Sequence, residues 1–243
     1  MTVQKIDKRR KYIAVFDTET AGTLGAPLVY DLVVTICDKQ GRIYEQGKWV
    51  ISEVFDNKKL MDNAYFGKKR PWYVEQITKG LMPKVPFKVA RAQFNRLMEK
   101  WNVQMVAAYN LSFDMRALTA TTRYLHKQFL PNESKKFLAR NLEIQDIWGF
   151  ACETIYQQKM FHRMIDQRGY FTPKENPLTN AEIGYRYITN QHDFEERHTA
   201  LNDTEVEVAI LAKCFASHKK YTKGIVGNPW RIVANRHKEL AVA

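Results

Sequence analysis

Two kinds of hydrophobic pattern alternate along the chain. Short, nearly continuous runs rich in β-branched and aromatic residues predict strands buried in a sheet, at residues 11–16, 30–37, 42–51, 105–109 and 142–150. The segment from Asp38 to Gly41 provides a hairpin turn between the second and third of these strands. The first three strands are therefore expected to form an antiparallel meander.

Elsewhere, hydrophobic residues recur at the three- and four-residue spacing of a helix that is buried on one face. This spacing predicts helices over residues 89–101, 111–129 and 203–217. The motif Thr179-x-x-Glu182 is typical of a capping box and predicts a helix from there to about Ile188. Residues 56–86 show no clear period, so loops and short helices are expected there.

The alternation of strands and helices indicates the α/β class, and no internal repeat or low-complexity linker divides the chain. We expect a single domain over residues 1–243, with a core at about 11–217 and a basic C-terminal extension at about 218–243. The chain has 243 residues, of which 45% are hydrophobic, so it can bury a core without disulfides or a structural metal.

Composition and charge narrow the class of protein. No apolar run approaches the roughly 18 residues of a membrane span, and the basic N-terminus lacks the apolar segment of a secretory signal. The three cysteines are far apart and form no C-x-x-C pair, which indicates a cytoplasmic protein. The net charge of +12 favours a polyanionic partner such as nucleic acid, although a merely solubilising charge is the alternative.

Asp17-Thr18-Glu19 places two carboxylates at the end of the first predicted strand. Alternation along an extended chain sends Asp17 and Glu19 to the same side. Two adjacent carboxylates repel each other, and a bound Mg²⁺ or Mn²⁺ would compensate their charge. The spacing alone is a weak signal, because it also occurs at Asp193/Glu195 and Asp203/Glu205. The buried strand before this pair and Gly22 after it set the pair apart.

Two further motifs carry groups suited to the same chemistry. Asn110-x-x-Phe113-Asp114 follows the fourth predicted strand and opens a helix, so Asp114 falls in a first helical turn near a strand end. His198-x-x-x-x-Asp203 leads into the last predicted helix, and histidine is suited to proton abstraction near neutral pH. Taken singly, each residue has a structural alternative: a helix-dipole partner, an exposed loop histidine or an N-cap.

Taken together and in this order, the three motifs resemble those of the DEDDh branch of the DnaQ-like 3′–5′ exonucleases. The resemblance extends from Asp17 to Asp203, and residues 198–205 are also similar to the corresponding stretch of ribonuclease T. It implies a ribonuclease H-like α/β fold with a central five-stranded mixed sheet and flanking helices. It also implies hydrolysis of single-stranded DNA from the 3′ end, releasing nucleoside 5′-monophosphates.

The resemblance further implies a role for each motif residue. Asp17 would be shared by two Mg²⁺ or Mn²⁺ ions, Glu19 and Asp203 would complete one metal site, and Asp114 would hold the second ion. His198 would take a proton from the attacking water. Two such ions can activate the water and stabilise the leaving 3′-oxygen. The residues implied to contact the terminal nucleotide are Thr18, Thr20, Ala21, Thr23, Leu24, Asn110 and Phe113.

Other assignments stay open at this point. Aromatic residues in loops or at segment ends could stack on unpaired bases, with Tyr65, Phe66, Trp72, Phe150 and Phe161 as candidates. An exoribonuclease that trims RNA ends is one alternative, because only the 2′-hydroxyl distinguishes the two substrates. A nucleic-acid-binding or polymerase-accessory module without chemistry is another. A DNA polymerase, another replication protein and a second copy of the chain are the candidate protein partners.

Overall fold

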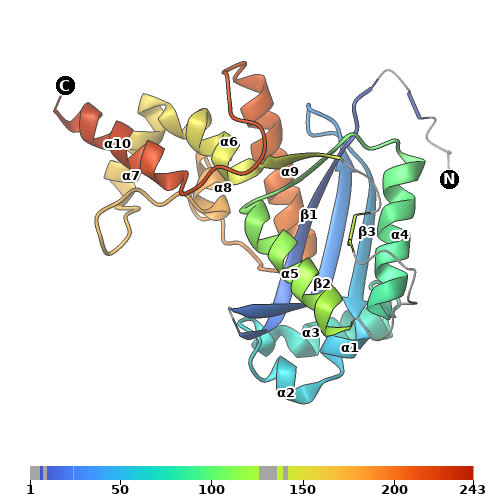
Figure 1. Cartoon of the computed structure of the whole chain (residues 1–243). Helices are drawn as coiled ribbons and strands as arrows, with labels where there is room; N and C mark the ends of the chain where they lie inside the picture. Colours follow the sequence, from blue (N-terminus) through green and yellow to red (C-terminus); the bar gives the residue numbers. More distant parts are fainter. Residues whose placement is uncertain (1–5, 8–9, 24, 126–135, 139–141, 243) are drawn as a thin grey trace.

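The structure, a computed structural model, describes residues 6–7, 10–23, 25–125, 136–138 and 142–242. Its centre is a mixed six-stranded sheet with the order β4-β3-β2-β1-β5-β6 (Figure 1). The strands are β1 (Ile13–Thr23), β2 (Ala26–Cys37), β3 (Ile43–Ile51), β4 (Lys84–Val85), β5 (Met105–Ala108) and β6 (Glu143–Asp146). All five predicted strands are present. The expected number of strands, five, was one too small, because the two-residue β4 is too short to give a periodic signal in the sequence.

The first three strands form the predicted antiparallel meander, while β5 and β6 continue the sheet in parallel. The prediction that the first strand ends before Asp17 is wrong, because β1 continues to Thr23 and pairs with β2 along its whole length. The pairing shifts between Glu19 and Thr20. The acidic motif therefore lies within a strand rather than on a turn, and its pairing with β2 fixes its backbone.

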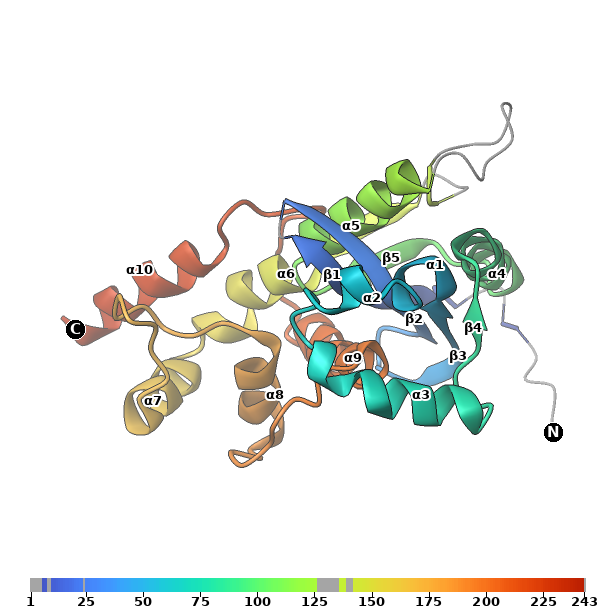
Figure 2. The same cartoon turned by 90° about the horizontal axis from the view of Figure 1, so that it is seen from below.

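Helices cover both faces of the sheet. Their bounds are α1 (Ser52–Phe55), α2 (Lys58–Met61), α3 (Arg70–Thr78), α4 (Phe87–Lys100), α5 (Leu111–Tyr124), α6 (Ile147–Glu153), α7 (Lys159–Arg168), α8 (Ala181–Thr189), α9 (Ala200–Ala216) and α10 (Trp230–Ala241), with short 3₁₀ turns η1 (Gly67–Lys69) and η3 (Ile155–Gln157). Helices α4 and α5 lie on one face of the sheet and α9 lies on the other (Figure 2). The predicted extension of α5 through residue 129 falls partly outside the described residues.

Three predicted boundaries change in the structure. The strand expected over 142–150 ends at Asp146, whose carboxylate accepts a hydrogen bond from the Trp148 backbone N–H at 3.2 Å and so starts α6. Helix α8 is capped by Asn180 rather than by Thr179, since the Asn180 side chain accepts from the Ile183 N–H at 3.1 Å. Helix α9 begins at Ala200, so Asp203 lies in its first turn and is not its N-cap.

Helix α9 is the element that ties the sheet to the rest of the chain. It packs on β1 and β2, and a 3.0 Å hydrogen bond joins the hydroxyls of Thr204 and Thr35. It also packs against α8, where a Cβ on Gly184 would lie 3.2 Å from Cδ1 of Ile210 on α9 and 1.9 Å from the hydroxyl of Tyr156 in η3. No helix in the described part of the chain is both long and apolar enough to cross a membrane.

Candidate active site

Three carboxylates from two elements meet where β1 passes the first turn of α9. Oxygen atoms of Asp17, Glu19 and Asp203 all lie within 4.8 Å of one another. Asp17 and Glu19 point to the same side of β1, as the alternation of an extended strand requires. Asp203 reaches them from α9, and its Oδ1 accepts no hydrogen bond from any described residue. This spacing suits a group of oxygen ligands around one divalent cation.

Asp114 lies in the first turn of α5, the helix that follows β5 after a two-residue turn. It is 2% exposed, and its Oδ1 accepts a 2.7 Å hydrogen bond from the hydroxyl of Thr18. Thr18 stands between Asp17 and Glu19 on β1 and points to the other face. The tripeptide Asp17-Thr18-Glu19 of β1 therefore supplies two carboxylates, and its threonine orients a third, that of Asp114.

Burial and mutual repulsion raise the pKa of every carboxyl group in this centre. Burial, followed by the charge of Asp31, raises the pKa of Asp17 to about 7. Burial, Asp17 and Asp203 raise the pKa of Glu19 to about 10. The pKa of Asp203 rises to about 9, from burial and then Asp17, and that of Asp114 rises well above its ordinary value for the same two reasons. These groups cannot all be ionised at neutral pH unless cations compensate them.

His198 directly precedes α9's N-cap and is held by residues distant in sequence. Its ring stacks on Phe66 with centroids 4.6 Å apart and planes 13° apart. The ammonium of Lys69 donates to the backbone oxygens of Arg197 and His198. His198 itself adopts φ +48°, a left-handed conformation that non-glycine residues rarely take. Phe66 and Lys69 thus fix the loop that presents the imidazole.

The imidazole faces Glu196, whose Oε2 lies 3.7 Å from its Nδ1. Burial, and then the charge of Lys69, lower the pKa of His198 below its ordinary value. The ring is therefore neutral at neutral pH and can accept a proton. His198 lies outside the group formed by Asp17, Glu19 and Asp203. Glu196 contacts His198 and also lines the same cavity as Asp17 and Asp203.

Glu196 was not predicted from the sequence, and Glu182 was predicted only as part of a capping box. Oxygen atoms of both, with a nitrogen of His198, lie within 4.8 Å of one another. Glu182 is fixed by an ion pair with Arg186 at 2.8 Å and accepts from the Glu196 backbone N–H at 2.9 Å. Burial and the charge of Asp17 raise the pKa of Glu196 to about 7. The loop before α9 has no regular period, so no signal in the sequence connects Glu196 with Glu182.

Asp31, also missed, is fully buried in β2 directly opposite Glu19. Its Oδ2 accepts from the Tyr73 hydroxyl at 2.8 Å and from the Ala200 backbone N–H at 3.3 Å. It therefore connects the sheet to the start of α9 and to α3, and its negative charge raises the pKa of Asp17. A lone aspartate inside an apolar run was a signal in the sequence that could have identified it.

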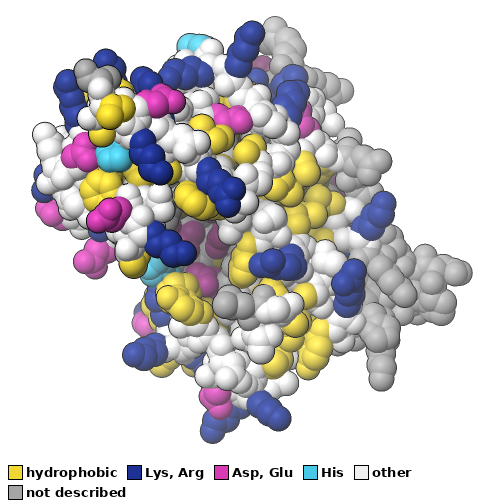
Figure 3. Space-filling view, turned by 60° about the vertical axis from the view of Figure 1, so that its left-hand side comes forward, with side chains coloured by type: hydrophobic (Ala, Val, Ile, Leu, Met, Phe, Trp, Pro, Cys, Tyr) yellow, Lys and Arg dark blue, Asp and Glu magenta, His cyan; other side chains and the backbone are white. Residues whose placement is uncertain are grey.

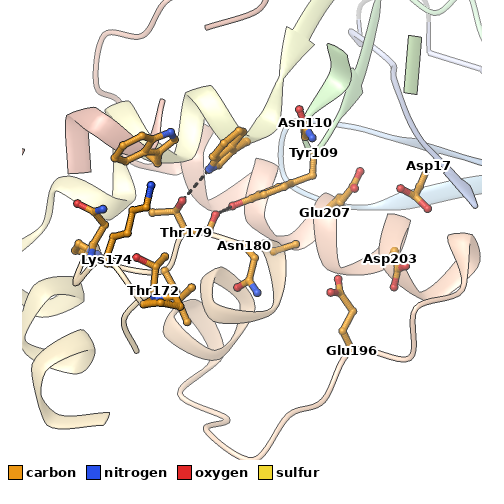
Figure 4. Close-up of a pocket in the computed structure, with 17 residues that line it drawn as sticks. Asp17, Tyr109, Asn110, Thr172, Lys174, Thr179, Asn180, Glu196, Asp203 and Glu207 are labelled. Atoms are coloured by element: carbon orange, nitrogen blue, oxygen red, sulfur yellow. Dashed lines mark hydrogen bonds between the residues drawn. The ribbon is translucent and has the colours of Figure 1, made fainter. Parts of the chain in front are cut away.

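A cavity of about 780 Å³ opens beside the carboxylates (Figure 4). Asp17, Asp203, Glu196 and Glu207 lie at one end of it. Its other end is formed by the segment before α8 and by two indole rings, Trp148 of α6 and Trp230 of α10. The Trp148 indole N–H donates to the Thr179 hydroxyl at 3.0 Å, which fixes one of the rings. The C-terminal segment therefore borders the site.

The residues implied to contact a terminal nucleotide occupy different environments. Thr18 and Ala21 are buried, Thr20 is partly buried and Thr23 is exposed, while Leu24 lies outside the described residues. Asn110 lines the cavity, and its backbone N–H donates to Asp146 at 3.1 Å. Phe113 is partly exposed, with the Arg116 guanidinium 5.5 Å from the centre of its ring.

The five aromatic candidates for stacking divide into two groups. Phe150 and Phe161 are 1% and 0% exposed and belong to the core around α6 and α7, so their assignment to a binding surface is wrong. The periodic pattern could not distinguish them from surface rings. Tyr65 is 88% and Trp72 37% exposed, whereas Phe66 packs on His198. Tyr65 and Trp72 are accessible to a ligand.

The charges around the site have opposite signs at its centre and its rim. Figure 3 shows acidic side chains at the bottom of a hollow, with a histidine beside them and lysine and arginine side chains around the opening. The chain as a whole carries +12. A polyanion would therefore be attracted to the rim, whereas the bare carboxylates would repel it from the centre.

No protein-family model matches the chain, and no curated protein matches it. Solved structures of exonuclease I do match it. A product-bound exonuclease I superposes with a TM-score of 0.52 at 14% identity, over 84% of this chain and 43% of that one. Exonuclease I of E. coli in complex with a 5cy-dT13 oligonucleotide gives 0.51 at 14% identity, over 96% and 45%.

The chain thus spans less than half the length of these exonuclease I chains. At this identity the similarity concerns the fold. Together with the mixed sheet and its flanking helices, it confirms the predicted architecture: the chain has an α/β, ribonuclease H-like fold.

Proposed function

We propose that this protein is a two-metal-dependent 3′–5′ exonuclease of the DEDDh type that degrades single-stranded DNA to nucleoside 5′-monophosphates. The observation that carries the proposal is the convergence of the motif carboxylates. Asp17, Glu19 and Asp203 form one compact group, and Asp114 is oriented beside it by Thr18. They do so on a fold shared with exonuclease I.

The residues present fit divalent cations. Asp17, Glu19 and Asp203, which meet in one group, offer oxygen ligands, the type that Mg²⁺ and Mn²⁺ prefer. The buried Oδ1 of Asp203 has no hydrogen-bond partner among the described residues, although buried polar atoms are almost always paired. Asp17, Glu19 and Asp203 would hold one ion, and Asp17 with Asp114 would hold the second. When bound, the two ions would activate a water molecule and stabilise the leaving 3′-oxygen.

The protein's own groups would then act on the water and the strand. His198, neutral at neutral pH, would accept the proton of the attacking water. Phe66 and Lys69 would hold the imidazole in place, and Glu196 beside it would favour the imidazolium that forms. The indole rings of Trp148 and Trp230, at the other end of the cavity, offer surfaces on which bases can stack.

Two observations favour single-stranded DNA as the substrate. One structural neighbour is exonuclease I in complex with an oligonucleotide. The basic rim of the hollow and the net charge of +12 suit a phosphate backbone. Because binding would release counterions, affinity should fall steeply as the salt concentration rises.

The test is a gel assay with 5′-labelled single-stranded DNA and RNA of one sequence, each with Mg²⁺, Mn²⁺ or EDTA. Metal-dependent shortening of DNA from the 3′ end, absent in Asp17→Ala, is the expected result. Asp166→Ala is the matched control, since this aspartate lies on α7 and forms an ion pair with His237 at 3.3 Å. Shortening of RNA alone would identify RNA, and not DNA, as the substrate. No shortening of either strand would overturn the proposal in favour of a binding module.

A further inference from the structure

Glu207 is a fifth carboxylate in the centre that no sequence motif includes. It lies on α9 one turn after Asp203, and a spacing of four residues places both on the same face of the helix. Glu207 is 3% exposed and lines the cavity together with Asp17 and Asp203. In Figure 4 its carboxylate lies between Tyr109 and Asp17.

The surroundings of Glu207 do not explain why a carboxylate is buried there. The carboxylate has a hydrogen bond with the backbone N–H of Tyr109, but its Oε2 has no hydrogen-bond partner among the described residues, and no described lysine, arginine or histidine forms an ion pair with it. The other buried residues on this part of α9 are mostly apolar, among them Val208, Ile210 and Leu211. Burying a carboxylate with one oxygen unpaired destabilises the fold, so an apolar residue would stabilise it better.

The two metal subsites differ in how many ligands they already have. The compact group of Asp17, Glu19 and Asp203 supplies three carboxylates to the first ion. The second ion has only Asp17 and Asp114. In Figure 4 the Glu207 carboxylate lies between Asp17 and Tyr109, and Tyr109 directly precedes α5, the helix that carries Asp114 in its first turn.

We propose that Glu207 supplies the missing carboxylate of the second metal subsite, together with Asp17 and Asp114. This inference rests on the proposed two-metal function. It explains both the burial of Glu207 and its unpaired oxygen, because a divalent cation compensates the charge that no side chain of the described residues compensates. Glu207 also lines the cavity beside Asp17, so its carboxylate can reach a cation bound there.

The experiment is titration calorimetry of the full chain with Mn²⁺, comparing wild type, Glu207→Gln and a control, Glu205→Gln. Glu205 lies on the same helix but is exposed, and its side chain contacts Gln46 at 3.3 Å. We expect wild type and Glu205→Gln to bind two ions. In Glu207→Gln the second ion should bind at least about tenfold more weakly, while the first ion is unaffected.

Thermal unfolding in EDTA separates a metal ligand from a structural residue. Gln is close in shape to Glu but uncharged, so Glu207→Gln should raise the midpoint without metal by removing repulsion. It should also reduce the stabilisation that Mn²⁺ provides. A lower midpoint in EDTA combined with unchanged Mn²⁺ binding would assign Glu207 a structural role and overturn the inference.

The outcomes also distinguish this inference from the proposed function. Two ions bound with equal affinity in wild type and Glu207→Gln would overturn the role of Glu207 and leave the exonuclease proposal in place. A weakened second ion in a protein that shortens neither DNA nor RNA would support the role of Glu207 and overturn the exonuclease. A wild type that binds no Mn²⁺ would overturn both.

Discussion

Replacing Asp17 by Asn should stabilise the metal-free protein while removing its activity. Asp17 lies within β1, and burial with the charge of Asp31 raises its pKa from 3.8 to about 7. A rise of that size means that holding Asp17 ionised in the folded state costs about 4 kcal/mol at about pH 8. Asn has nearly the same shape and carries no charge, so the substitution removes this cost.

The gain in the free energy of unfolding from Asp17→Asn will be smaller than the full electrostatic cost of the ionised aspartate. The backbone N–H of Thr18 stabilises the ionised form of Asp17, and part of that interaction is lost with a neutral amide. We expect a gain of about 2 kcal/mol at about pH 8, which corresponds to a rise in midpoint of about 4–8 °C for a chain of this size.

The sign of the pH dependence follows from the raised pKa. The cost of Asp17 is absent below the unfolded-state value of 3.8, grows as the pH rises towards about 7, and is constant above that. At about pH 5 the folded protein already carries a proton on Asp17, and the cost falls to about 1.5 kcal/mol. The advantage of Asp17→Asn over wild type should therefore shrink as the pH falls.

The assay is thermal or urea unfolding of both proteins in EDTA at the two pH values, followed by the same scans with Mn²⁺. Wild type should gain stability from Mn²⁺ and the variant should gain little. Its nuclease rate should fall by more than about 100-fold, since even outer-sphere partners of a metal cost 10–100-fold. A variant less stable than wild type in EDTA, or a gain equal at both pH values, would refute the electrostatic reasoning.

Three further substitutions test other parts of the site and the fold. His198→Asn should lower kcat by about 10²–10⁴-fold and leave Mn²⁺ binding intact. Because the pKa of His198 is lowered, kcat of the wild type should decline only below about pH 6.5. A pH profile of kcat centred above that pH would contradict this role. Lys69→Met should release the backbone before α9 and reduce kcat at least about tenfold with little change in the unfolding midpoint, measured by single-turnover kinetics and calorimetry. Gly184→Ala should destabilise the protein by about 1–3 kcal/mol in urea unfolding, because the new methyl group meets the Tyr156 hydroxyl, and a neutral result would show that α8 shifts without cost.

Patterns along the chain predicted those elements whose signal is local. The apolar runs located every strand longer than two residues, and the alternation of β1 correctly placed Asp17 and Glu19 on one side. The boundary of the first strand was wrong because threonines at 18 and 20 continue an extended chain where the acidic residues suggested a turn. The cap of α8 was wrong because Asn180 and Thr179 are both good caps, and only the tertiary contact of Thr179 with Trp148 decides between them.

The residues that the sequence did not predict are those whose role depends on a distant element. Asp31 is defined by its contacts with Tyr73 and Ala200, and Glu196 by its position between His198 and the cavity. Neither relation has a fixed spacing. Glu207 is different, because a glutamate four residues after Asp203 in an otherwise apolar helix face was visible in the pattern.

The arrangement of the carboxylates couples folding to cation binding. β1, β2, α5 and α9 each bring at least one acidic residue to the same place, and burial raises the pKa of each of them. The folded chain thus stores repulsion that the unfolded chain does not have. A cation that binds only the folded state adds about 2.7 kcal/mol at one hundred times its Kd. The stability of this protein should therefore depend on divalent cations far more than that of a fold held by its core alone, and substitutions that neutralise the centre should weaken that dependence in proportion to the charge they remove.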